Sequence, residues 1–261
     1  MLAAARHQHI LSALRLQGSV SVGGLQRQLQ TTAMTVWRDL KALEELGLLR
    51  RVRGGACFPG NLPGEPGYEE KKREAREAKR RIGAVAVREF VRDGETIALE
   101  GGTTVAALIE HLPRSRVSIV TNSLPVALQV RSLRPECPVQ IAGGWISPVS
   151  GNATGPETLR VMEKWQASVC FISATGFDGE AGPSDPNPLE IEAKRMLASR
   201  AREVVLLLDS GKFGRRSAAI TLHPRRIGTL ITDARPPRDI LALIRRNRIR
   251  LRVASPPESI A

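Results

Sequence analysis

Hydrophobic and polar positions divide the chain into two parts with different patterns. Up to about Phe58, apolar residues recur at helical spacing, and this pattern predicts three helices. Ser21 and Thr32 have side chains suited to cap the second and third of these helices. The apolar positions of the first two helices are Ile10, Leu11, Leu14, Leu25 and Leu29.

The third predicted helix has an apolar stripe and a separate polar face. Val36, Leu40 and Leu43 lie at i, i+4 and i+7, so they share one buried side. Residues 48–58 combine apolar residues with arginines around a Gly-Gly pair, which predicts two extended pieces joined by a tight turn. The first part of the chain is therefore expected to form three helices and a small wing.

Beyond Asp93, short apolar runs alternate with helical patterns. Strands buried on both faces and separated by helices are typical of an open, mostly parallel α/β sheet. Strands are predicted at 96–99, 117–121, 139–142, 169–174, 204–208, 229–232 and 249–253. Helices are predicted at 105–111, 124–133, 157–165, 190–201 and 237–246.

The two parts are joined by a segment with the composition of a linker. Residues 59–68 contain three prolines and three glycines, and the charged stretch 69–92 then predicts one connecting helix. We expect an N-terminal domain at 1–58, the linker and connecting helix at 59–81, and a larger α/β domain at 82–261.

Composition narrows the class of protein. The length of 261 residues suits one large or two unequal domains, and 42% hydrophobic residues suffice for a core. No window approaches the roughly 18 apolar residues of a membrane span, so a cytoplasmic protein without a membrane partner is expected. Cys57, Cys137 and Cys170 lack metal-ligand spacing, so we expect reduced thiols, no metal and no cofactor.

The charge indicates a polyanionic partner. The formal net charge is +13, which favours nucleic acid or an anionic surface. Most of the basic residues are arginine, however, and an arginine bias also arises from genome composition. Charge alone therefore leaves the partner open.

The third helix and the wing carry the residue types that read DNA. A helix-turn-helix presents the start of its second helix to the major groove, where small polar side chains and arginine contact bases. Wing arginines are placed for phosphates. The alternative is an interaction helix with a solvated basic face. The candidate residues are Thr31, Thr32, Thr35, Trp37, Arg38, Lys41, Arg51 and Arg53.

Turns rich in glycine and hydroxyls follow three of the predicted strands. The carboxyl ends of parallel strands meet at one edge, so these turns are expected to converge on one crevice. The turn after the first strand also opens a helix and could cradle a phosphate, although each turn alone is equally typical of ordinary structure. The candidates are Gly102, Thr103, Thr104, Asn122, Ser123, Gly143 and Gly144.

Two later polar features, a residue pair and a turn, have ordinary structural interpretations as well. Glu190 and Lys194 lie at i, i+4, which predicts a surface ion pair. Residues 209–211 predict an ordinary turn.

Taken together, these motifs carry a family resemblance. Residues 19–56, including Thr35-Val36-Trp37-Arg38-Asp39-Leu40 and Arg51-Val52-Arg53-Gly54-Gly55-Ala56, resemble the winged helix-turn-helix of the DeoR family of bacterial transcriptional regulators. That family usually has arginine at the position of Trp37. The indole is expected to pack against sugar or a thymine methyl, or to join the protein core.

The α/β part resembles the sensor domain of the same family, which is similar in fold to ribose-5-phosphate isomerase. The resemblance rests on Glu100-Gly101-Gly102-Thr103-Thr104, Thr121-Asn122-Ser123, Gly143-Gly144, Gly176-Phe177-Asp178, Glu192-Ala193-Lys194-Arg195 and Asp209-Ser210-Gly211-Lys212. It implies a phosphorylated sugar effector, with the phosphate at residues 102–104 and Asn122 and Ser123 lining the pocket. By the same resemblance, Asp178, Glu192, Asp209 and Lys212 would face the sugar. Glu100 stands where the family often has Asp.

Catalysis is the main alternative. An aldose-ketose isomerase needs a carboxylate base and polarising groups, and Glu192, Asp209 and Lys212 are suitable types. Asp178, however, lacks the second acidic residue of the isomerase's Asp-Gly-Ala-Asp-Glu run. We therefore expect a regulator and not an enzyme. A basic nucleic-acid-binding protein without an effector is the third hypothesis.

The regulator hypothesis implies two partners besides a second copy of the chain. Double-stranded operator DNA binds the winged helix, and a phosphorylated sugar changes the affinity for that DNA, with repression of carbohydrate genes as the output. A homodimer or homotetramer is expected, with half-sites about 34 to 36 Å apart or a multiple of that distance.

Overall fold

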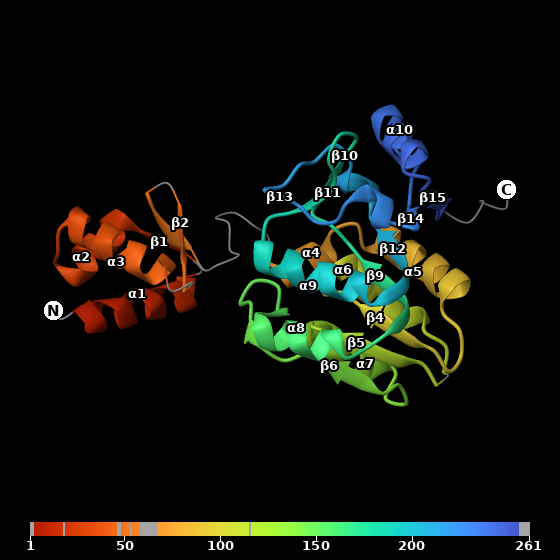
Figure 1. The fold of residues 1–261 in the computed structure, drawn as a ribbon, viewed down its shortest axis with the longest axis horizontal. Helices are drawn as coiled ribbons and strands as arrows, with labels where there is room; N and C mark the ends of the chain where they lie inside the picture. Colours follow the sequence, from red (N-terminus) through yellow and green to blue (C-terminus); the bar gives the residue numbers. More distant parts are fainter. Residues whose placement is uncertain are drawn as a thin grey trace. The chain divides into compact units, whose positions relative to one another are not determined.

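The computed structural model describes residues 3–17, 19–45, 48–52, 54–57, 67–114 and 116–255. The chain forms two compact units, Met1–Pro66 and Gly67–Ala261, and Figure 1 shows the elements of each. Nearly all of the predicted linker lies outside the described residues.

The first unit contains the predicted helices and wing. Ser21 caps the second helix by accepting a hydrogen bond from the Gly24 N–H at 3.0 Å, and Thr32 accepts one from the Thr35 N–H at 3.3 Å. A third strand joins the wing, in the order β1-β3-β2. The elements are α1 (Ala3–Gln17), β1 (Ser19–Ser21), α2 (Val22–Leu29), α3 (Ala33–Glu45), β2 (Arg50–Val52) and β3 (Gly55–Cys57).

The core of the first unit forms where the helical spacing predicts it. Trp37 packs against this core while remaining partly exposed, so the indole contributes to packing. The buried members include Ile10, Leu14, Leu25, Leu29, Val36, Leu40 and Leu43.

A partly buried ion pair ties α3 to α1. The Asp39 carboxylate accepts hydrogen bonds from Arg6, at 2.6 Å from Nε and 2.9 Å from Nη2, and lies 3.2 Å from His7 Nε2. Burial alone would raise the pKa of Asp39, but the hydrogen bonds and charges of Arg6 and His7 outweigh it and lower that pKa. The pair therefore fixes the helix that carries the candidate DNA contacts.

The second unit is built on a seven-stranded sheet in which every strand pair is parallel. Its order is β15-β14-β12-β9-β4-β5-β6, and all seven predicted strands belong to it. The strands are β4 (Thr96–Leu99), β5 (Ser118–Thr121), β6 (Val139–Ile141), β9 (Ala167–Ile172), β12 (Ala201–Leu207), β14 (Thr229–Thr232) and β15 (Arg250–Val253). The predicted fold class is confirmed.

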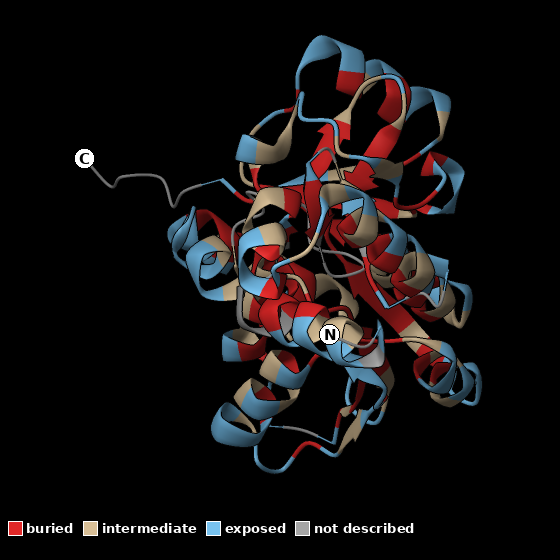
Figure 2. Cartoon of the chain, turned by 90° about the vertical axis from the view of Figure 1, so that its left-hand side faces the viewer, coloured by how far each residue is buried: buried red, intermediate tan, exposed pale blue. Residues whose placement is uncertain are grey.

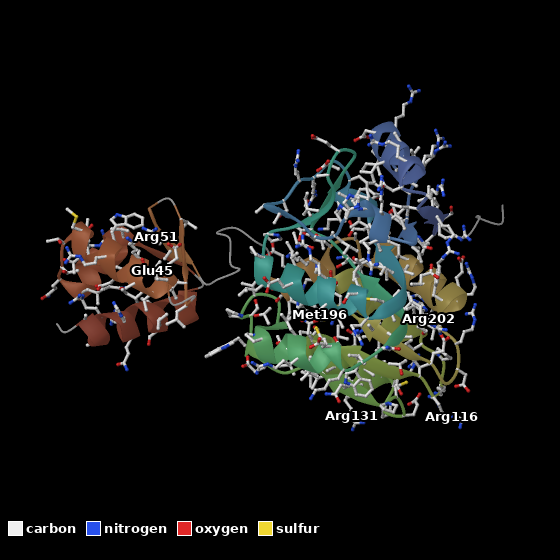
Figure 3. All side chains as sticks on the ribbon, viewed as in Figure 1. Glu45, Arg51, Arg116, Arg131, Met196 and Arg202 are labelled. Carbon is white, nitrogen blue, oxygen red and sulfur yellow. The ribbon has the colours of Figure 1, made fainter. Side chains whose placement is uncertain are left out.

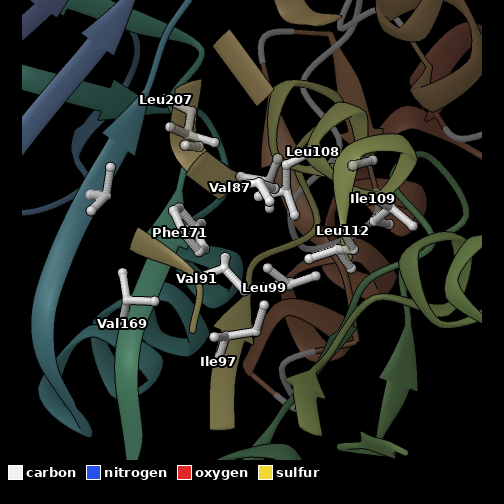
Figure 4. Packing of buried hydrophobic residues seen from close by; sticks show 14 of the residues in the cluster. Val87, Val91, Ile97, Leu99, Leu108, Ile109, Leu112, Val169, Phe171 and Leu207 are labelled. Carbon is white, nitrogen blue, oxygen red and sulfur yellow. The ribbon is translucent and has the colours of Figure 1, made fainter. Parts of the chain in front are cut away.

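Helices cover both faces of this sheet, because alternate residues of each strand point to opposite sides. Ile97 and Leu99 face one core, whereas Ala98 faces the other. Figure 4 shows the first core, and in Figure 2 the strands lie buried between helices with exposed outer faces. The first face is covered by α5 (Arg76–Phe90), α6 (Thr103–Ala106), η1 (Ala107–His111) and α7 (Leu124–Leu133). The second is covered by α8 (Pro156–Glu163), α9 (Pro188–Ser199) and α10 (Arg238–Arg246).

The predicted single helix at 69–92 is wrong. Two helices occur there, α4 (Tyr68–Arg73) and α5, separated at Ala75, whose φ of 49° lies in the left-handed region. A residue with that backbone conformation cannot continue a right-handed helix. Both helices belong to the second unit.

Several short elements of the second unit lack the length for a periodic signal, and of these the sequence predicts only the turn at 209–211. They are β7 (Trp145–Ile146), β8 (Ala153–Thr154), β10 (Gly176–Asp178), β11 (Gly182–Asp185), β13 (Ala219–Ile220), η2 (Ser210–Lys212) and η3 (Pro224–Arg226). They lie between the main strands and helices. One of them, β11, supplies a charge to the site described below.

Three further features concern surface and composition. No helix in the described part of the chain is long and apolar enough to span a membrane. Cys137 and Cys170 are buried free thiols, and the side chain of Cys57 lies outside the described residues. Exposed arginines such as Arg116, Arg131 and Arg202 lie on the second unit, so the basic charge is not confined to the first (Figure 3).

We predict that Asp39→Asn lowers the free energy of unfolding of the first unit by about 2 kcal/mol, since a charged hydrogen-bond acceptor is lost. Because the folded pKa of Asp39 is lowered, its contribution is complete above the ordinary value of about 3.9 and is lost as the pH falls through the folded pKa. Amide hydrogen exchange of α1 and α3 measures this stability. Glu45→Gln, at an exposed position of α3, is the control, and equal effects of the two variants would contradict the prediction.

Candidate functional site

The strand order reverses beside β4. From β4 the chain continues to β5 and β6 on one side, and then returns to place β9 on the other side of β4. Ligands of open α/β sheets bind beyond the carboxyl ends of the strands at such a reversal. The residues that follow β4 and β9 therefore define the candidate site.

Glu100 joins the ends of these two strands. It directly follows β4, and its Oε2 accepts hydrogen bonds from Ser173, which follows β9, at 3.1 Å from the backbone N and 3.0 Å from Oγ. Its Oε1 lies 3.2 Å from Lys194 Nζ. Glu100, at the position where the resembled family often has Asp, is thus buried and hydrogen-bonded, and it links the end of β4 to the end of β9.

Lys194 is the centre of this buried cluster. Its Nζ donates to Asp185 Oδ2 at 2.7 Å and to the Ser173 carbonyl at 3.0 Å. Burial opposes the charge on Lys194, but Asp185 and Glu100 outweigh that effect and raise the pKa of the ammonium, so it stays protonated. The predicted surface pair of Glu190 with Lys194 is wrong, because Lys194 lies on the buried stripe of α9 with Ile191.

Glu190 belongs to a neighbouring set of hydrogen bonds. Its carboxylate accepts from Ser150 Oγ at 2.7 Å, Asn187 Nδ2 at 3.0 Å and Asn152 Nδ2 at 3.1 Å. The Asn152 side chain lies against Gly101, where a Cβ would come within 1.8 Å of Asn152 Oδ1. Glycine is required at 101 because that close approach leaves no space for a side chain.

Buried oxygens of two asparagines and one aspartate around the strand ends have no hydrogen-bond partner among the described residues. They belong to Asn122 after β5, Asn152 beside β4 and Asp209 after β12, which are 3%, 3% and 4% exposed. Asn122 Nδ2 donates to the Ala153 carbonyl, and Asn152 Nδ2 donates to Glu190. The Oδ1 of each asparagine therefore points away from that acceptor. Unpaired buried acceptors are costly, and they suit a ligand that brings hydroxyl donors.

The turn after β12 is fixed by a neighbour. Asp233, which follows β14, accepts from the Ser210 N–H at 2.7 Å and from Ser210 Oγ at 3.1 Å. Lys212 Nζ lies 3.6 Å from Glu74 Oε2, and Asp209 is buried at the start of the turn. The predicted turn therefore exists and holds both Asp209 and Lys212.

The structure brings most of the predicted effector residues to one edge of the sheet, although not all of them. Gly102 lies so close to Ser173 that a Cβ would meet its Oγ at 1.8 Å, Thr104 is buried, and Thr103 Oγ1 donates to the Lys71 carbonyl at 3.5 Å. Ser123 caps α7 by accepting from the Val126 N–H at 3.4 Å.

Four predicted effector residues have other surroundings. Gly143 follows the edge strand β6 and accepts a hydrogen bond from Thr158 Oγ1 at 2.7 Å, and a Cβ at Gly144 would meet that oxygen. Asp178 closes the β10–β11 hairpin by accepting two backbone N–H groups at 2.8 Å. Glu192 is exposed on α9, on the side opposite to the buried stripe. Asp178 and Glu192 therefore do not join the Glu100 cluster.

In the first unit, the predicted DNA-binding residues share an accessible region. Thr32, Arg38 and Lys41 are exposed, and Thr31 and Thr35 are half-buried. Arg51 Nε donates to Glu44 Oε2 at 2.6 Å, which ties the wing to α3, and Figure 3 labels Arg51 and Glu45 there. Arg53 lies outside the described residues.

Sequence reasoning missed Ser173, Asp185, Asn152 and Lys79 and assigned Lys194 to the surface. A signal existed for both lysines. Lys194 lies three residues from Ile191 and from Leu197, and Lys79 lies three from Ile82, so each occupies an apolar stripe. No comparable signal existed for Asp185, because β11 has only four residues.

These two units define a class of protein: a winged helix-turn-helix joined to an α/β domain with a buried polar cluster at the strand reversal. Residues 6–61 match the model of the DeoR-like helix-turn-helix domain, and residues 74–234 match that of the DeoR C-terminal sensor domain. The chain belongs to the DeoR family. It is a DNA-binding transcriptional regulator and not an enzyme, as predicted.

Characterised relatives align along most of the chain. The regulator GolR of Listeria innocua is 32% identical over 87% of this chain and 89% of its own length. The glycerol-3-phosphate regulon repressor of Escherichia coli is 28% identical over 94% of this chain and 97% of its own. Ribose 5-phosphate isomerase A of Methanocaldococcus jannaschii superposes with a TM-score of 0.40 at 17% identity, covering 53% of this chain and 54% of that enzyme.

We predict that Lys194→Met lowers the free energy of unfolding of the second unit by about 3 to 5 kcal/mol, because Glu100 and Asp185 lose the cation between them. Denaturant unfolding followed by tryptophan fluorescence or circular dichroism measures this change. The double variant Lys194→Met/Asp185→Asn should recover part of the loss, and Glu192→Gln should behave as the unsubstituted protein. A loss below about 1 kcal/mol would mean that the cluster is hydrated.

Proposed function

We propose that this protein represses carbohydrate genes and that a phosphorylated sugar bound at the strand reversal of the second unit changes its affinity for operator DNA. The observation that supports the effector site best is the set of open acceptors on Asn122, Asn152 and Asp209. A sugar carries several hydroxyl donors, and it can satisfy these acceptors without a metal or a cofactor.

The phosphate-bearing end of the effector needs cations and donors. Lys212 and the Thr103 hydroxyl lie at the same edge of the sheet, and the Lys212 ion pair with the half-exposed Glu74 is long at 3.6 Å. A phosphate offers a stronger partner than that carboxylate at this distance, because charge-assisted bonds to phosphate are short. We assign the effector to residues 102–104, Asn122, Ser123, Asp209 and Lys212, with Asn152 added.

The names of the relatives support the choice of effector class. Besides the glycerol-3-phosphate regulon repressor, a lactose phosphotransferase system repressor of Streptococcus mutans is 32% identical over 87% of this chain. We propose that this protein likewise acts in the cytoplasm on carbohydrate genes. A homodimer or homotetramer would place two winged helices on one operator.

The DNA-binding residues that we propose are those of α3, the turn before it and the wing. Arg38 and Lys41 are exposed on the polar face of α3, whose opposite face carries the buried Val36 and Leu40. Basic side chains on that face can reach bases or phosphates once the helix lies in the major groove.

The effector assignment predicts a specific loss in Asp209→Asn. Each member of a panel of sugar phosphates is added beside its unphosphorylated parent, since a ligand at about a hundred times its Kd raises the free energy of unfolding by roughly 2.7 kcal/mol. One phosphate ester should raise the Tm of the unsubstituted chain, and the shift should fall sharply in Asp209→Asn. The exposed Glu192→Gln should keep the full shift. A panel without any shift would disprove the proposed effector class.

For DNA we predict that Arg38→Ala weakens operator binding by about 1 to 3 kcal/mol if the arginine contacts a base. The operator sequence is selected from a random pool with the unsubstituted chain, and both proteins are then titrated at several salt concentrations. An even loss on all sequences with a shallower salt slope would instead assign Arg38 to a phosphate. Arg131→Ala, an exposed arginine of the second unit, serves as the control. Unchanged affinity of Arg38→Ala would remove it from the interface.

A further inference from the structure

The second unit contains two buried lysines with opposite surroundings. Lys194 has carboxylate oxygens at 2.7 and 3.2 Å and is 6% exposed. Lys79, on α5, is only 2% exposed, yet no carboxylate in the described part of the chain lies within ion-pair distance of its Nζ. Its one hydrogen bond goes to the Lys71 carbonyl of α4. A buried ammonium without a carboxylate is unusual and calls for an anion.

A shared hydrogen-bond acceptor places Lys79 beside an assigned effector residue, because the Lys71 carbonyl accepts from both Lys79 Nζ and Thr103 Oγ1. The nearby charges agree with this position. Burial lowers the pKa of Lys79, the nearby carboxylate of Asp209 opposes that effect, and Lys212 adds to it. Asp209 and Lys212 are the two ends of the turn after β12 that the proposed effector touches. Lys212 reaches the segment that Lys79 contacts, since its Nζ lies 3.6 Å from Oε2 of Glu74, the residue that follows α4.

Two hydroxyls share the surroundings of Lys79. Thr103 Oγ1 donates to the same Lys71 carbonyl that accepts from Lys79, so the two donors are neighbours. The Tyr68 hydroxyl is buried without a hydrogen-bond partner among the described residues, and the charge of Glu100 acts on it. Tyr68, Lys79 and Thr103 also line one hollow of about 750 Å³. An ammonium without an ion-pair partner within the described ranges, a second lysine nearby and the unpaired Tyr68 hydroxyl are groups that can bind a phosphate dianion.

We propose that Lys79 is a further effector-binding residue, whose ammonium binds the phosphate of the effector together with Lys212. This inference rests on the proposed function. Because Lys79 also holds the Lys71 carbonyl, the phosphate acts on α4, which begins at Tyr68 directly after the predicted linker. The bound phosphate and the first helix of the second unit thus share one side chain.

The test compares Lys79→Met with Lys79→Arg and with Lys164→Met, an exposed lysine that does not line this hollow, as the control. The probes are orthophosphate and the sugar phosphates of the panel, titrated by thermal shift and calorimetry on the full chain. Lys79→Met should raise the apparent Kd for these phosphates at least about tenfold, whereas Lys79→Arg should retain part of the affinity and Lys164→Met all of it. In the absence of phosphate, Lys79→Met should keep or increase the Tm, since a buried charge without a carboxylate is removed.

Each contrary result has a distinct meaning. A lower Tm of Lys79→Met with an unchanged phosphate Kd would make Lys79 a structural tie between α4 and α5 and would overturn the inference. If Asp209→Asn abolishes binding while Lys79→Met binds normally, the proposed function stands and this inference fails. If no phosphate binds the unsubstituted chain, both fail. Amide exchange in residues 68–79 should change on adding phosphate to the unsubstituted chain and stay constant in Lys79→Met.

Discussion

The second unit depends on the charge of Lys194 being neutralised inside the protein. Its Nζ reaches carboxylates from the end of β4 and the end of β11 while the lysine itself lies on α9, so one cation fixes three elements. The carboxylates must lie close to a buried ammonium, because only close partners offset the free-energy cost of removing the charge from water. The strand reversal is therefore held in place by electrostatics, in addition to the two apolar cores on either side of the sheet.

This arrangement decides which groups remain for a ligand. Glu100 accepts a hydrogen bond from the Ser173 hydroxyl, and the Glu190 carboxylate accepts hydrogen bonds from three donors. These carboxylates therefore already have hydrogen-bond partners within the protein. Other groups lack partners. Asn122 and Asp209 each have a carboxyl or amide oxygen without a hydrogen-bond partner among the described residues, and the ammonium of Lys79 has a hydrogen bond there but no ion pair. Acceptors beside cations match a molecule that has hydroxyl donors at one end and an anion at the other. The chemical class of the effector follows from the groups that the protein leaves unpaired.

Sequence patterns predicted the frame of the molecule and only part of the site. The inner strands of the sheet were indicated because a run buried on both faces is apolar throughout, and α3 was indicated by Val36, Leu40 and Leu43. The charged cluster was missed because Asp185 and Lys194 come from elements whose approach depends on the tertiary fold. Asp178 and Glu192 were assigned by resemblance alone, and that criterion does not distinguish a hairpin turn or an exposed helix position from a crevice.

A regulator also needs a difference in effector affinity between its two functional states, since equal affinity would shift no equilibrium. Contacts made only by the rigid strand ends would be the same in both states. The α4 and α5 helices differ from the strands in this respect, because α4 is short, begins after the linker segment, and is separated from α5 by the left-handed Ala75. A phosphate held partly by Lys79 has an affinity that depends on where α4 and α5 lie. The effector can therefore favour one position of the chain that leads to the DNA-binding unit.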